Sequence, residues 1–88
     1  MPWTFLTTHG LVLVEIAEDP HQTMRAVAEK LGVSQRTVQA VVRDLVTEGY
    51  LTRTRTGRRN VYQVNRGGRM RHPAAQGRSI ATLLRAFE

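Results

Sequence analysis

The sequence predicts an α+β fold that is mostly α, with three helices, a two-stranded β-hairpin and an extra C-terminal helix. Three observations support this prediction. Apolar residues recur at helical spacing in three stretches before Gly49. After Gly49 the pattern changes to threonines alternating with arginines and then to a second β-rich run, which is typical of paired strands. A last apolar stripe at helical spacing falls within residues 79–88.

The length and composition indicate one small domain. A chain of 88 residues has a marginal core, for which oligomerisation often supplies missing burial. The absence of cysteine excludes disulfides, thiolate metal sites and thiol nucleophiles. No apolar run approaches the roughly 20 residues that span a bilayer, and the start, MPWTFLTT, does not resemble a signal peptide. We therefore expect a cytoplasmic protein, associated with the nucleoid and without a membrane partner.

The net charge of +6 is unevenly distributed. Residues 53–88 contain nine arginines and one glutamate, whereas residues 1–52 contain four basic and six acidic residues. This asymmetry indicates a polyanionic partner that contacts mainly the second half. Only Lys30 among the thirteen basic residues is a lysine. Arginine suits forked recognition of phosphates and bases, although a GC-rich genome would account for the bias equally well.

The first helix is expected to begin near Thr7 or Thr8 and to end before Pro20. Its residues 11–17 are apolar around most of the circumference, so we expect cover on two sides. The next two helices can provide one side, and the chain's own C-terminal segment or a second subunit the other. Residues 21–22 are a candidate for a very short strand.

Residues 23–49 predict two helices around a tight turn. Thr23 can cap the first, Gly32 can supply the left-handed residue that ends it, and Ser34 can cap the second. The second helix has a core stripe of Val38, Val41, Val42, Leu45 and Val46. Its opposite face carries Arg36, Gln39, Ala40, Arg43 and Thr47. Arginine can bind guanine or phosphate and glutamine can bind adenine. On a lone helix such residues would form a merely solvated face, but the turn before this helix and the arginine-rich stretch after it favour base recognition in a major groove.

The second half predicts a β-hairpin followed by a basic tail. Residues 50–56 and 61–65 are the expected strands, and Gly57 to Asn60 the turn. The expected inward residues are Leu51, Tyr62 and Val64. Arginines crowd the strand and the tip, which suits a minor groove or the phosphate backbone; the alternative is an edge strand protected by charge. These arginines are Arg53, Arg55, Arg58 and Arg59.

Residues 66–72 predict a flexible, basic, irregular linker, after which Pro73 can open a helix. The final stripe consists of Ile80, Leu83, Leu84 and Phe87, with Ser79 as a possible cap. A helix this short is not stable alone, so we expect it to pack against the first helix and Trp3 or to pair with its copy in a dimer. The expected division is residues 1–65 as a DNA-binding domain and residues 66–88 as linker and C-terminal helix.

This order of elements resembles the winged helix-turn-helix of bacterial transcription regulators of the MarR and ArsR type. The resemblance covers about residues 5–65 and is carried by VAEKLGVSQRTVQAVVRDLVTEGYL and TRTRTGRRNVYQV. It implies a recognition helix from Ser34 through Arg43 and a wing tip at residues 57–60. Two features depart from the pattern, because the chain lacks the long flanking dimerisation helices of MarR proteins and the cysteines of ArsR-type metal sensors.

Together these patterns predict a sequence-specific DNA-binding transcriptional regulator that binds double-stranded DNA as a homodimer. The alternative is a winged-helix module that binds a protein within a transcription complex. The expected DNA-contacting residues are Arg25, Ser34, Gln35, Arg36, Thr37, Gln39, Arg43, Arg53, Arg55, Arg58 and Arg59.

Enzymatic chemistry is not indicated. The three histidines lack the spacing that holds a metal on one helix face. Asp19 and His21 could supply two metal ligands, but a helix-ending turn at Pro20 is the simpler interpretation. Gly67-Gly68 lacks the context of a nucleotide-binding loop, and no nucleophile has an evident base. We therefore expect no enzyme and no cofactor.

Overall fold

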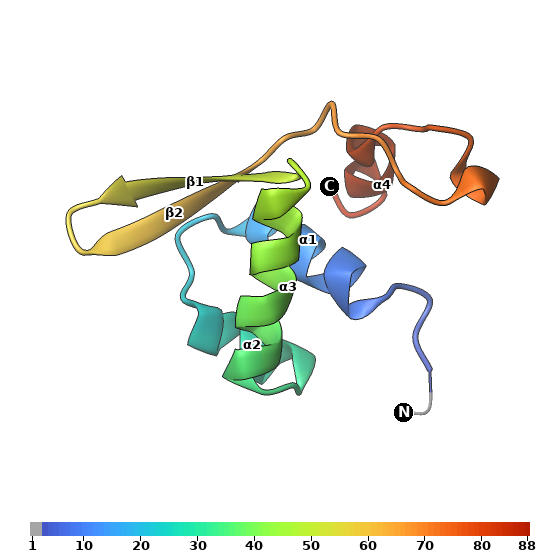
Figure 1. Cartoon of the computed structure of the whole chain (residues 1–88). Coiled ribbons are helices and arrows are strands. Elements are labelled where there is room, and N and C mark those ends of the chain that lie inside the picture. The colour runs from blue at the N-terminus through green and yellow to red at the C-terminus, as the bar shows by residue number, and fades with distance from the viewer. Residues whose placement is uncertain (1–2) are drawn as a thin grey trace.

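The computed structural model describes residues 3–88 and has three helices, a two-stranded antiparallel hairpin and a short C-terminal helix (Figure 1). The elements are α1 (Thr8–Glu18), α2 (Met24–Leu31), α3 (Gln35–Thr47), β1 (Leu51–Thr56), β2 (Arg59–Val64), the 3-10 turn η1 (Pro73–Ala75) and α4 (Ile80–Arg85). The predicted fold, a winged helix-turn-helix with an extra C-terminal helix, is confirmed. No helix among the described residues is long and apolar enough to cross a membrane.

The predicted helix ends are confirmed at the level of individual hydrogen bonds. Each of the first three helices has an N-cap hydroxyl that accepts from the backbone N–H three residues later; these caps are Thr7, Thr23 and Ser34. Gly32 ends α2 with a left-handed backbone, φ +69°. Because a glycine adopts this conformation without strain, the chain turns sharply and α3 begins after only two intervening residues, Val33 and Ser34.

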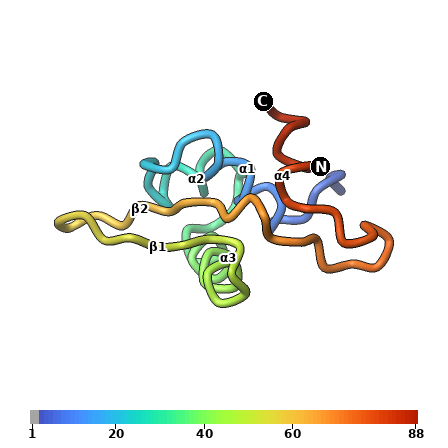
Figure 2. The backbone as a smooth tube through the Cα atoms, turned by 90° about the horizontal axis from the view of Figure 1, so that it is seen from above, coloured from blue at the N-terminus to red at the C-terminus, as the bar shows by residue number. Residues whose placement is uncertain are grey.

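A single hydrophobic core joins α1, α2, α3, the base of the hairpin and α4. Its buried residues are Val12, Leu13, Val14, Ile16, Val27, Ala28, Val38, Val41, Val42, Leu45, Leu51, Tyr62, Ile80 and Leu84. In Figures 1 and 2, α1 lies between α2 and α4. The cover that the apolar first helix required on its second side is therefore provided within the chain, by the C-terminal segment.

The hairpin pairs in register from Leu51 opposite Val64 to Thr56 opposite Arg59. Leu51 and Tyr62 are buried, as predicted, and Val64 is partly buried. The predicted four-residue turn was wrong, because Arg59 and Asn60 belong to β2 and the turn contains only two residues. Gly57 alone supplies the positive φ, +62°, that a tight two-residue turn requires.

The very short strand predicted at residues 21–22 was also wrong, since β1 and β2 are the only strands among residues 3–88. Side-chain hydrogen bonds to backbone carbonyl oxygens hold this segment instead. The guanidinium of Arg59 donates to the carbonyl oxygen of His21 at 2.8 Å. The amide of Gln22 donates to the carbonyl oxygen of Glu15 at 2.7 Å. The hairpin therefore contacts the α1–α2 turn through one arginine and not through a third strand.

Residues 66–79 are here called the C-terminal loop. Residues 66–72 contain no helix or strand, as predicted, and Pro73 opens the short turn η1, but the predicted flexible linker is instead held by hydrogen bonds. Within the loop, the Met70 N–H donates to the Arg78 carbonyl at 2.9 Å. The loop is also bonded to α4, because the Ile80 N–H donates to the Gly68 carbonyl at 2.7 Å. The hydroxyl of Tyr50 donates to the Arg69 carbonyl. These bonds fix the loop to the start of β1 and the start of α4.

The C-terminal apolar stripe divides between core and surface. Ile80 and Leu84 are buried, Leu83 is half-buried and Phe87 is 47 % exposed. The helix ends at Arg85, so Phe87 lies beyond its last turn. Trp3, the expected cover, is 63 % exposed and packs edge to face on Phe5, with 5.1 Å between ring centroids.

Candidate nucleic-acid interface

Helix α3 presents one face to the core and the opposite face to solvent. The predicted outward set, Arg36, Gln39, Ala40, Arg43 and Thr47, is fully on the exposed side. At its first turn the hydroxyls of Ser34 and Thr37 hydrogen-bond to each other at 2.9 Å. This cap secures the start of the helix. The side chains that can contact bases therefore stand on a rigid element rather than on a loop.

A hollow of about 640 Å³ separates α3 from the hairpin, and we call it the hairpin groove. The α1–α2 turn also lines this groove, through His21, Gln22 and Thr23. Among its lining residues are six of the eleven predicted DNA contacts: Gln35, Gln39, Arg43, Arg53, Arg58 and Arg59. Two glutamines and an arginine from α3 thus face three arginines from the hairpin, although up to 24 residues separate them in sequence. This is the arrangement that a helix in a major groove and a wing on its flank would need.

Five predicted residues do not line this groove. Ser34, Arg36 and Thr37 are exposed at the start of α3. Arg25 lies on α2 and forms an ion pair with Glu29 at 3.3 Å. Arg55 donates to the carbonyl oxygen of Gly57 at 3.1 Å, so it braces the hairpin turn.

The basic side chains differ in whether they already have a hydrogen-bond or ion-pair partner within the protein. Of the thirteen basic residues, nine form an ion pair or a side-chain hydrogen bond within the described part of the chain. The four without such a partner in residues 3–88 are Arg36, Arg43, Arg53 and Arg58. All four stand on α3 or the hairpin. Their guanidinium groups keep all donors available to an external anion.

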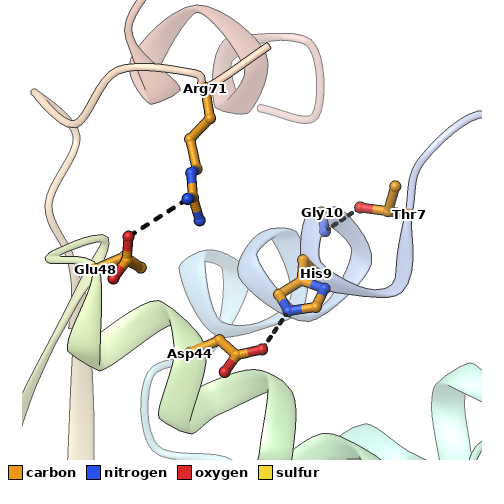
Figure 3. Close-up of polar contacts among 6 residues, drawn as sticks. All are labelled: Thr7, His9, Gly10, Asp44, Glu48 and Arg71. Carbon is orange, nitrogen blue, oxygen red and sulfur yellow. Dashed lines mark hydrogen bonds and ion pairs between the residues drawn. The ribbon is translucent and has the colours of Figure 1, made fainter.

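Two acidic residues near the end of α3 are engaged by other elements (Figure 3). Asp44 bonds to Nε2 of His9 on α1 at 2.9 Å. Glu48 forms an ion pair with Arg71 in the C-terminal loop, with 3.5 Å between Oε1 and Nη2. These contacts place positive or neutral groups beside the only carboxylates at this end of the helix, within the described residues.

A second hollow, of about 790 Å³, lies on the other side of α3, and we call it the C-terminal groove. Its walls include Arg43 and Thr47 from α3, the C-cap residue Glu48, Leu13 from α1, and Met70, Arg71, Ile80 and Leu83 from the C-terminal segment. Arg43 and Thr47 border both grooves. Sequence analysis did not single out Arg71, because nothing in its local sequence indicates that the loop folds back beside α3.

Comparison with protein families gives a match to the MarR family over residues 4–59, from before α1 to the first residue of β2 and more than half of the chain. The chain belongs to the MarR family. Membership confirms the predicted resemblance to MarR regulators and indicates a DNA-binding transcriptional regulator; regulators of this family are not enzymes. A comparison with curated proteins gives no significant match.

The MarR match covers all of α3 and the tip of the hairpin, and residues 60–88 lie outside it. The C-terminal loop and α4 therefore lie outside the matched segment. No cluster of three or more potential metal-ligating side chains occurs in the part of this MarR-family chain that the structure describes.

Proposed function

We propose that this domain is a transcriptional regulator that binds double-stranded DNA in a sequence-specific manner, with α3 in the major groove and the hairpin on the minor groove or the backbone. The observation that carries the proposal is that the four arginines without a partner in residues 3–88 all stand on α3 or the hairpin. Four exposed like charges on α3 and the hairpin destabilise the free protein slightly and favour a polyanion.

The side chains support distinct roles on this proposed complex. Arg36 and Gln39 project from the first half of α3, where a recognition helix meets base edges. Arginine can fork onto guanine and glutamine onto adenine, so these two would carry specificity. Arg53 and Arg58 stand on the hairpin and would bind phosphates, which orient the protein without reading sequence.

The proposal is tested by titrating the protein into a labelled random duplex and into fragments selected from genomic DNA, each over a series of salt concentrations. We expect affinity to fall steeply with salt on both duplexes, because bound arginines release counterions. We expect the selected fragments to bind more tightly at every salt concentration. No binding to any duplex at low salt would overturn the proposal.

Absence of DNA binding at low salt would favour the alternative function, a module that binds a protein partner. One observation supports this alternative: Trp3, Phe5 and Phe87 expose aromatic surface, with Phe5 94 % exposed. Exposed aromatic side chains of this size are typical of protein interfaces. They are equally suited to the pairing of two copies of this chain.

We infer that the regulator acts as a homodimer in the cytoplasm, where it meets the nucleoid. A two-fold dimer would set two α3 helices about 34 Å apart, one turn of DNA, and would select a palindromic site. Sedimentation at micromolar concentration, with and without a selected duplex, tests this inference. A monomer mass in solution and a single copy on the duplex would overturn it.

A further inference from the structure

The C-terminal segment, residues 66–88, consists of the C-terminal loop and the residues from α4 to the end. It contains five arginines outside the family match, and four of them bond within the segment itself. Arg66 bonds to Glu88, Arg69 to the Gly77 carbonyl, Arg78 to Gln76 and Arg85 to Thr82. Arg71 alone reaches out of the segment, to Glu48 at the end of α3. Its contact, at 3.5 Å, is the longest of the five, and 71 % of its side chain is exposed.

The position of Arg71 is defined by the two grooves that flank α3. Arginines of the hairpin line the hairpin groove, and Arg71 lines the C-terminal groove. Figures 1 and 2 show the hairpin and the C-terminal loop leaving α3 in opposite directions. The exposed face of α3 therefore stands between two basic elements, one from inside the family match and one from outside it.

We propose that the C-terminal loop is a second phosphate-binding element and that Arg71 contacts the DNA backbone on the side of α3 opposite to the hairpin. This proposal rests on the proposed DNA-binding function. A helix in the major groove lies between two sugar–phosphate strands, and the hairpin can follow only the one on its own side. The loop supplies a cation for the other strand.

The loop holds Arg71 in place before DNA arrives. Its backbone is bonded to α4 through Gly68 and to Tyr50 through the Arg69 carbonyl. Gly68 lies so close to the Tyr50 ring that an added Cβ would meet its Cδ1 atom at 2.9 Å. Because the loop is already ordered, a phosphate contact by Arg71 costs only side-chain entropy.

The existing contact with Glu48 is compatible with this role. A guanidinium has five N–H donors in a planar fork, and the ion pair with Glu48 involves only one terminal nitrogen. The remaining donors of Arg71 stay available to a phosphate. The same contact also places a positive charge over a carboxylate that would otherwise repel the backbone. Arg71 therefore has two separable effects, binding a phosphate and screening Glu48.

The first experiment measures the salt dependence of binding for the full chain and for Arg71→Ala on a random duplex. Loss of one phosphate contact should lower the slope of log K against log salt by about 0.9. Arg85→Ala is the matched control, because it removes the same charge from α4, which runs away from α3 in Figure 2. Arg85→Ala should leave the slope unchanged.

The outcomes separate this proposal from the proposed function. Failure of the unmodified chain to bind any duplex at low salt would overturn the function itself. Binding by the unmodified chain, with equal slopes for Arg71→Ala and Arg85→Ala, would overturn only the second phosphate-binding element. Thermal unfolding of each variant verifies that the exposed substitution has not altered the fold.

A second experiment separates phosphate binding from the screening of Glu48. Arg71→Ala is compared with its parent in a Glu48→Gln background, where no carboxylate needs screening. A phosphate contact predicts the same loss of slope, about 0.9, in both backgrounds. If Arg71→Ala left the salt slope unchanged in the Glu48→Gln background, Arg71 would only screen the acid.

Hydroxyl-radical footprinting on a selected duplex gives an independent measure. Arg58→Ala and Arg71→Ala should each lose protection of backbone positions, and the two sets should lie on opposite sides of the site contacted by α3. Loss of the same positions in both variants would overturn the proposed location of the loop.

Discussion

Helix α3 with its hairpin and the C-terminal segment are both rich in arginine, yet their arginines do different things. On α3 and the hairpin, four of six have no partner within residues 3–88. In the C-terminal segment all five are bonded, four of them to neighbours in the same segment. Arginine content alone therefore does not identify a nucleic-acid surface; arginines left without a protein partner are the better indication.

The two regions also differ in how their apolar residues are used. Helix α3 buries four of its five stripe residues and partly buries the fifth, Val46, while its other face is wholly exposed. Helix α4 has six residues and buries only Ile80 and Leu84, with Phe87 left at the surface. A short helix contributes little stability of its own, so α4 depends on those two side chains and on the bonded loop before it.

The largest expected effect tests whether α4 belongs to the core as firmly as α3 does. Leu84 is 2 % exposed, so Leu84→Ala should lower the free energy of unfolding by about 2–5 kcal/mol. Phe87→Ala, at a half-exposed position, should change it by about 0.5 kcal/mol or less. Urea denaturation measures both. Equal effects would mean that α4 does not share the core.

The next effect concerns specificity and the arginines of the two regions. If Arg36 meets a base edge, Arg36→Ala should cost about 1–3 kcal/mol on the best duplex and relax base preference at one position. Arg85→Ala should cost nothing on either duplex. Quantitative gel shifts on selected and random DNA measure this. Equal losses on both duplexes would assign Arg36 to a phosphate.

A smaller effect on stability is expected at the N-caps of α3 and α4, which are both serine. The hydroxyl of Ser34 accepts from the Thr37 N–H at 3.0 Å, whereas Ser79 makes no side-chain cap bond to α4. Ser34→Ala should therefore cost about 1 kcal/mol of stability and Ser79→Ala only a few tenths. Thermal unfolding distinguishes them. A larger loss at Ser79 would reverse the assignment.

The smallest expected effect concerns the hairpin tip. Arg58→Ala removes an arginine without an internal partner, so the salt slope on random DNA should fall by about 0.9 and stability should stay unchanged. Between about 50 and 200 mM salt this amounts to roughly a three- to four-fold change in relative affinity. Should the slope remain that of the unmodified chain, the hairpin tip would not contact the backbone.

Local sequence determined much of this structure. Thr7, Thr23 and Ser34 cap helices at the predicted places, and Gly32 and Gly57 supply the positive φ angles that end α2 and turn the hairpin. These features depend on hydrogen bonds and torsions within a few residues, so a short stretch of sequence is sufficient to specify them. The same holds for the exposed face of α3, because helical period alone sets which residues oppose its core stripe.

Only the tertiary structure decided which partner each long side chain has. Arg59 bonds to His21, and this replaces the strand predicted at residues 21–22. Arg71 lies beside α3, 23 residues from Glu48 in sequence, because Ile80 and Leu84 draw the C-terminal segment onto the core. An arginine has several rotatable bonds and binds any acceptor it can reach. Its partner is therefore set by the packing of distant elements, which the local sequence does not encode.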